Sequence, residues 1–281
     1  MKKFSNFFSV FLFFLMQMRI FGLIINHLTI MTDRAKTLID KMIAAGDAVQ
    51  RENLMRFFKT GEGDYGEGDQ FLGLKNPQTR AFVKDYKDLD FEDIQALIDS
   101  EYHEIRLCGF LILVEKYQKL QSAKLLHDVN SMAERDAIAS FYVRNSTRAN
   151  NWDIVDLSAP KIIGSWIVDK TIMQLPDKED IVQRLAESDN LWQKRISMVF
   201  TWMTSHNNLP EYALKYAKFH LKHPHDLMHK AVGWMLRELG KCCGMDILRD
   251  FLADYRNEMH RTTLRYAIEK MDEKERQYWM T

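Results

Sequence analysis

Four segments of this chain share one layout, and each would be apolar around most of its circumference as a helix. Each begins with polar or basic residues and continues with an apolar stretch, in residues 103–117, 191–206, 227–241 and 259–270. If Phe110, Val199, Trp234 and Tyr266 are equivalent points, the intervals are 89, 35 and 32 residues. A helix that is apolar on all sides must be buried, and one such helix per roughly 35–45 residues is typical of stacked helix pairs.

Helical periodicity recurs in the rest of the chain, and no convincing alternation of apolar and polar residues interrupts it from Thr32 to Thr281. The segments include 119–129, 153–157, 159–174 and 190–206, and all five prolines fall between such segments or at their starts. The sequence therefore predicts an all-α fold, a HEAT-like helical-repeat solenoid whose curvature produces a long concave face.

Composition excludes several other classes of protein. With 46% apolar and 28% charged residues, the chain is neither disordered nor fibrous, and 12 Gly and 5 Pro are too few for a β-sandwich or barrel. Three cysteines cannot form a disulfide framework and suit a reducing compartment, so we expect a cytoplasmic protein. The chain has 39 basic and 39 acidic residues, so its formal net charge is zero. Residues 140–270, however, carry 19 basic and 16 acidic residues, and this local excess of positive charge permits a polyanionic partner.

Residues 1–30 form a separate apolar extension. Their only charges are Lys2, Lys3 and Arg19, and the apolar run 7–16 is about ten residues long, short of the ~20 that span a membrane. No small-residue cleavage site follows the run, as a signal peptide requires. We expect a mis-assigned start, with Met31 as the initiator and residues 31–281 as the helical-repeat domain; a membrane anchor is the alternative.

Three segments carry candidate chemistry. In NNWDIVD (150–156), Trp152 and Asp156 are four residues apart, so one helix face presents an indole beside a carboxylate. LWQKR places Arg195 at the head of a buried helix, and GWMLRE places Trp234 and Arg237 in another. Each has a structural interpretation as well: the tryptophans pack in the core, the aspartates favour the first-turn dipole, and Arg237 lies on a solvated face.

Taken together, NNWDIVDLSAP, LWQKRISMVF, HKAVGWMLRE and LRYAIEK resemble the DNA alkylation repair family of HEAT-like DNA glycosylases. The segment RFFKTGEGDYGEGDQFLGL (56–74) resembles the N-terminal region of many members, and the similarity extends from about Asp33 to Lys270. The chain departs from the pattern in two places. Asp226 and Leu227 stand where some members carry aromatics, and Lys75 stands where some carry glutamine.

The resemblance implies hydrolysis of the N-glycosidic bond of N7- or N3-alkylated purines in duplex DNA, as a step of base excision repair. Such a base is cationic and departs neutral, so the barrier lies in the oxocarbenium-like sugar, which one carboxylate can stabilise. By similarity that carboxylate is Asp156, and Trp152 and Trp234 flank the deoxyribose. Arg195 and Arg237 would contact the DNA backbone, and Lys230 and Lys75 complete the expected DNA-binding set. The resemblance implies a monomer, with no cofactor, no metal and no deep base pocket.

Other interpretations remain open. The family includes members that bind DNA without catalysis, and a concave face also suits a protein partner. His220, His223, His225 and His229 suggest zinc, but they straddle Pro224, and a solvated loop that gains charge near phosphates is the preferred interpretation. The glycine-rich acidic segment 61–69 lacks EF-hand spacing, so we expect a flexible connector rather than a calcium site, with a connector that orders beside DNA as the alternative.

Overall fold

The computed structural model describes residues 31–172 and 179–281, and the prediction about residues 1–30 lies outside them. Within these ranges the chain is helical, and its β structure is confined to one isolated bridge between Gln70 and Tyr102. The all-α prediction is confirmed. The helices are α2 (Asp33–Ala44), α3 (Ala48–Phe57), α4 (Asn76–Tyr86), α5 (Phe91–Ile98), α6 (His103–Leu120), α7 (Val129–Arg144), α8 (Trp152–Ala159), α9 (Ser165–Ile172), α10 (Glu179–Glu187), α11 (Leu191–Val199), α12 (Thr201–His206), α13 (Pro210–His220), α14 (Asp226–Cys243), α15 (Met245–Tyr255), α16 (Arg261–Ala267) and α17 (Glu273–Met280).

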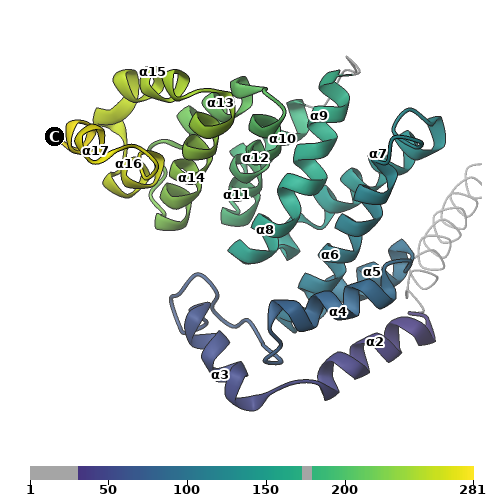
Figure 1. Cartoon of the computed structure of the whole chain (residues 1–281). Helices are drawn as coiled ribbons and strands as arrows, with labels where there is room; N and C mark the ends of the chain where they lie inside the picture. The colour runs from purple at the N-terminus through teal and green to yellow at the C-terminus, as the bar shows by residue number, and fades with distance from the viewer. Residues whose placement is uncertain (1–30, 173–178) are drawn as a thin grey trace, which may run out of the picture.

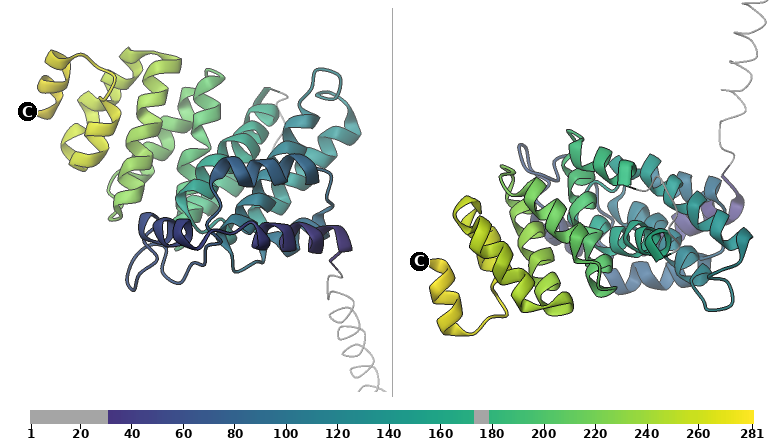
Figure 2. Two further views of the ribbon diagram at one scale, coloured as in Figure 1. Left: turned by 60° about the horizontal axis from the view of Figure 1, so that its bottom comes forward. Right: turned by 90° about the horizontal axis from the view of Figure 1, so that it is seen from above.

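The helices follow one another along a curved stack that runs from α2 to α17 (Figure 1). In the two further views the C-terminal helices lie at one end of the stack, and α2, the first described helix, lies towards the other (Figure 2). This is the helical-repeat solenoid that the sequence predicts. No helix in the described ranges combines the length and the apolar character that crossing a bilayer requires.

Helices α6 and α14 form the centre of the core. Both are 18 residues long, and α6 buries side chains around its whole circumference from His103 to Val114. Helix α14 packs against α12, α13, α15 and α16. A close approach needs Gly233, since a Cβ there would overlap the carbonyl oxygen of Thr263 and lie 2.5 Å from the Cβ of Tyr266. The segment 103–117 is therefore an inner helix of the stack, as predicted. The segments 227–241 and 259–270 are not buried on all sides, since Lys241 and Tyr266 are exposed.

Three helices that carry predicted site residues begin at polar caps. Asn151 accepts a hydrogen bond from the backbone N–H of Trp152 at the start of α8, and Asn190 caps α11 through Trp192 and Gln193. The ring of His225 accepts from the N–H of Leu227 at the start of α14. These side chains satisfy backbone donors that the first turn leaves unpaired, and so fix where each helix begins.

The structure corrects three element predictions. Residues 119–129 do not form a helix of their own: α6 ends at Leu120, and turns lead to α7, which Asp128 caps. Residues 190–206 form two helices, α11 and α12, that meet at Phe200. Pro160 is not between helices, because α8 continues into α9 through a wide π turn over Pro160–Gly164. A wider turn accommodates the missing N–H and the ring of a proline inside a helical run.

Candidate active site

A cleft of about 760 Å³ opens between the loop after α3 and the N-terminal halves of α8, α11 and α14, with α16 at its edge. Six of the seven residues predicted for the site line it, and Lys75 does not. The lining residues are Phe57, Lys59, Gly63, Asp64, Tyr65, Trp152, Asp156, Arg195, His225, Asp226, Leu227, Lys230, Trp234, Arg237 and Tyr266. The fold thus brings together side chains from five separate segments of the chain.

Asp156 and Arg195 form a bidentate ion pair in the cleft wall. Nε of Arg195 donates to Oδ1 of Asp156 at 2.9 Å, and Nη2 donates to Oδ2 at 2.8 Å. The remaining terminal nitrogen, Nη1, donates to the backbone oxygen of Leu227 at 2.6 Å. The Asp156 side chain is 16% exposed and that of Arg195 is 6% exposed, so the carboxylate reaches the cleft while the guanidinium lies behind it.

Burial raises the pKa of Asp156 above that of an ordinary aspartate, and the charge of Arg195 and its hydrogen bonds act in the opposite direction. The guanidinium also fixes the plane of the carboxylate, because two parallel hydrogen bonds leave it one orientation. Arg195 therefore donates hydrogen bonds to the Asp156 carboxylate and to the backbone of Leu227.

The two predicted indoles, Trp152 and Trp234, line the same cleft as Asp156. Trp152 is the first residue of α8, and Asp156 follows one turn later on the same face, as their spacing predicts. The ring of Phe58 stacks on Trp152 at 5.3 Å between centroids, and Phe57 meets it edge-on at 5.9 Å. These contacts hold the Trp152 ring in place before any ligand binds.

Tyr65 is a cleft residue that the sequence interpretation missed. Nε1 of Trp152 donates to its hydroxyl at 3.3 Å, and its ring meets Trp192 edge-on at 6.1 Å. The segment 61–69 is therefore not the flexible connector that we expected but a loop folded against the cleft. Gly66 allows this fold, since a Cβ there would lie 2.5 Å from the carbonyl oxygen of Phe58. The glycine content was the only sequence signal for such a tight loop.

A buried ionic network anchors this loop behind Trp152. The His103 ring contacts Oδ2 of Asp69 through Nδ1 at 3.1 Å and Oδ2 of Asp153 through Nε2 at 3.0 Å. Arg106 pairs with the other oxygen of Asp69. Burial lowers the pKa of His103, but the two carboxylates outweigh that effect and raise it to about 9. The His103 imidazolium thus joins the loop, α6 and α8.

A series of ring contacts connects His103 to Trp152 in the cleft. His103 stacks on Phe71 at 4.5 Å between centroids and lies 5.0 Å from Phe58, which in turn stacks on Trp152. Glu104, the next residue after His103, accepts the backbone N–H groups of Leu72, Gly73 and Leu74 at 2.8–3.0 Å. The start of α6 therefore fixes both the loop and the ring that supports Trp152.

The remaining predicted cations differ in their positions. Nζ of Lys230 pairs with Asp226 at 2.6 Å at the cleft, and Arg237 pairs with Glu269 beside it. Arg237 is not on a fully solvated face, since its side chain is 17% exposed. Lys75 is exposed at the start of α4 and borders a neighbouring cavity, which shares Phe57 and Trp152 with the cleft. The predicted DNA-contacting roles of these residues stay predictions.

The histidine cluster differs from the solvated loop that we expected. His220 and His229 are buried, and Nε2 of His220 lies 2.8 Å from Oγ of Ser197. Burial lowers the pKa of His220 to about 3 and that of His223 to about 4, so these rings are neutral near pH 7 and add no charge for phosphates. Among the described residues, three candidate metal donors come together only at His206, Glu238 and Cys242, so neither this cluster nor segment 61–69 forms such a group.

Comparison with known proteins identifies the family. The model of the DNA alkylation repair enzyme family matches residues 38–271. A solved structure described as a predicted DNA alkylation repair enzyme from Enterococcus faecalis superposes with a TM-score of 0.60 at 15% identity, and the match covers 81% of this chain and 97% of that one. At this identity the superposition supports the fold alone. No curated protein matches the chain by sequence. Because the family model spans most of the chain, this protein belongs to the DNA alkylation repair enzyme family, which indicates a role in the repair of alkylated DNA.

Proposed function

We propose that this protein is a DNA glycosylase that hydrolyses the N-glycosidic bond of N7- or N3-alkylated purines in duplex DNA. One observation carries the proposal: the Asp156 carboxylate lies in an open cleft that Trp152 and Trp234 also line. A scaffold that only binds a polyanion gains nothing from a partly exposed carboxylate at this place, since phosphates are bound by cations and N–H donors.

The chemistry follows from the charge of the substrate. An alkylated purine leaves as a neutral base, so its departure needs no general acid, and positive charge develops on the deoxyribose instead. A carboxylate fixed in advance near that sugar stabilises the developing charge and orients the attacking water. The two indole faces add about 0.5–2 kcal/mol each by attracting the cationic sugar.

Arg195 serves this mechanism by holding Asp156 ionised and oriented rather than by contacting the substrate. Its hydrogen bonds to Asp156 and Leu227 support this positioning role. The first turns of α8 and α14 lie at the cleft, and helix N-termini favour phosphate groups. Lys230 and Arg237 lie at the same surface, and phosphates would compete there with their partners Asp226 and Glu269. We propose that duplex DNA lies along the concave face and is processed by a monomer in the cytoplasm.

The test is to incubate methylated duplex DNA with the full chain and to measure free 7-methylguanine and 3-methyladenine by chromatography. The parent protein should release both bases. Asp156→Asn should lower release about 100- to 1000-fold, the range seen when one group that stabilises transition-state charge is removed. It should retain most of its affinity for DNA, because Asp156 is not a phosphate ligand.

The chain offers a matched control in Asp169, a mostly buried aspartate that pairs with Arg135 at 3.3 Å outside the cleft. Asp169→Asn also breaks a buried ion pair but should leave base release close to the parent rate. If Asp156→Asn released bases as fast as the parent, the proposed mechanism would be wrong. If the parent bound DNA with strong salt dependence and released no base, the protein would be a non-catalytic DNA-binding member of its family.

A further inference from the structure

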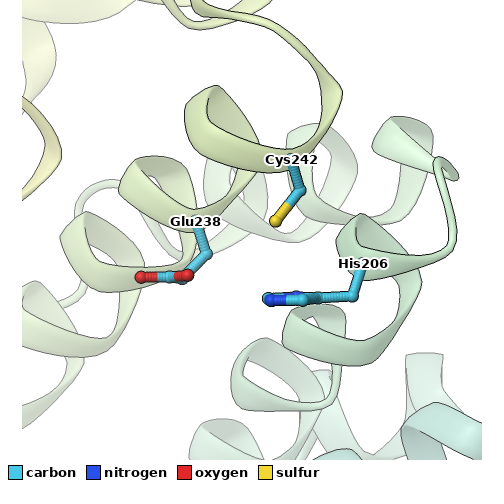
Figure 3. A group of neighbouring side chains, drawn as sticks. All are labelled: His206, Glu238 and Cys242. Atoms are coloured by element: carbon cyan, nitrogen blue, oxygen red, sulfur yellow. The ribbon is translucent and has the colours of Figure 1, made fainter.

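A group of metal-donor side chains lies outside the cleft, where α12 ends against α14. His206 is the last residue of α12, and Glu238 and Cys242 are one turn apart on α14. Their donor atoms all lie within 4.8 Å of one another. Figure 3 shows the imidazole of His206 extending toward α14 and the sulfur of Cys242 pointing toward it. Metal ligands occupy such separations with small side-chain rotations.

The His206 ring is already held as a metal ligand would be. Its Nδ1 lies 2.7 Å from the carbonyl oxygen of Trp202, and since a carbonyl only accepts hydrogen bonds, Nδ1 carries the proton. In a neutral imidazole this leaves the lone pair on Nε2. The ring also stacks on the Trp202 indole at 3.7 Å between centroids. A hydrogen bond from the second ring nitrogen to a carbonyl is the usual support of a metal-binding histidine.

Glu238 supplies a carboxylate whose charge is balanced in the protein by cations. Nζ of Lys241 lies 2.8 Å from Oε2, and Nε of Arg237 lies 3.7 Å from Oε1. The Glu238 side chain is 8% exposed, whereas that of Lys241 is 48% exposed on a flexible stem. Lys241 can therefore withdraw into solvent when another cation takes its place, and Arg237 keeps its pairing with Glu269.

We propose that His206, Glu238 and Cys242 bind one Zn²⁺ ion, with water as the fourth ligand. One imidazole nitrogen, one thiolate and one carboxylate oxygen form a donor set suited to Zn²⁺ or Co²⁺, whereas Mg²⁺ and Ca²⁺ prefer oxygen ligands throughout. On binding, the Cys242 Sγ–H bond breaks, the proton passes to solvent and the thiolate bonds the metal. No oxidation is involved.

This site was missed in the sequence, from which we expected no metal. His206 and Glu238 are 32 positions apart, and only the packing of α12 on α14 brings them together. The site is independent of the proposed glycosylase reaction. It links two helices of the stack, one of which carries Trp234, Lys230 and Arg237, so an ion there should stiffen the wall of the cleft.

The experiment is a titration of the full chain with Co²⁺ under a thiol-free reductant, followed by absorption spectroscopy. A cobalt–thiolate bond gives a charge-transfer band in the near ultraviolet. We expect this band to saturate at one ion per chain and to disappear when Zn²⁺ is added. Circular dichroism of each variant establishes that it is folded.

Cys243 provides a matched control, because it neighbours Cys242 and its Sγ instead donates to the carbonyl oxygen of Ser205 at 3.2 Å. Cys243→Ser should keep the band, Cys242→Ser should lose it, and His206→Gln should weaken Co²⁺ affinity by at least roughly tenfold. The proposal is overturned if the folded parent gives no band at micromolar Co²⁺. It is equally overturned if the band survives Cys242→Ser or depends on Cys243.

Discussion

Replacing His103 with glutamine should remove most of the pH dependence of stability above neutral pH. The His103 ring is 1% exposed between Asp69 and Asp153, which raise its pKa from 6.5 to about 9 despite burial. A raised histidine pKa means that the folded protein holds the proton more tightly than the unfolded chain. The resulting stabilisation is fully present below about pH 6.5 and is lost as the pH rises through about 9.

The magnitude follows from the size of the shift. Since one pKa unit corresponds to about 1.4 kcal/mol, the whole effect is about 3 kcal/mol. About 2 kcal/mol of it should be lost between about pH 6.5 and about pH 8.5, where the cysteines of the unfolded chain begin to ionise. The free energy of unfolding of the parent should fall by this amount relative to that of His103→Gln, in urea titrations followed by circular dichroism, because the other histidines contribute equally to both proteins.

The slope with pH, rather than the absolute stability, is the deciding measurement, because His103→Gln also removes a buried hydrogen-bonding partner and lowers stability at every pH. The exposed His127 gives the control, and His127→Gln should keep the parent slope. If His103→Gln lost stability with pH as steeply as the parent, His103 would not be the protonated centre of the network.

Three further predictions concern the cleft and the helix that forms its wall. Trp234→Ala should reduce release of methylated bases roughly 2- to 30-fold, the equivalent of about 0.5–2 kcal/mol of cation–π attraction, and a rate equal to the parent would remove Trp234 from the mechanism. Burial raises the pKa of Asp156, and the ionised carboxylate is the active form. As the pH falls, base release should therefore begin to decline at a higher pH than it would with an aspartate of ordinary pKa, and a pH–rate profile of single-turnover release measures this. Gly233→Ala should destabilise the protein by about 1–3 kcal/mol in urea titration, since the added methyl group overlaps Thr263 and pushes α16 away from α14; an unchanged midpoint would contradict this close packing.

Helical spacing in the sequence predicted which cleft residues lie together on one helix. The spacing of Trp152 and Asp156 places both on one face of α8, because a helix brings residues four apart into register wherever it lies. The apolar segment around Phe110 likewise predicted an inner helix, because a helix without a polar face has to be buried. The helix starts at Trp152 and Leu191 follow from their asparagine caps.

Contacts between distant segments were decided by tertiary packing. Arg195 reaches Asp156 across 39 positions, Tyr65 reaches Trp152 across 87, and His103 joins carboxylates 34 and 50 positions away. The histidines 220 and 229 were expected in solvent, yet packing buries them. Sequence periodicity reports which face of a helix is apolar, whereas the partner of that face depends on how the stack curves. The sequence therefore identified most of the candidate residues that line the cleft. The pairing that orients the Asp156 carboxylate and supports the Trp152 indole was decided only when the helices packed.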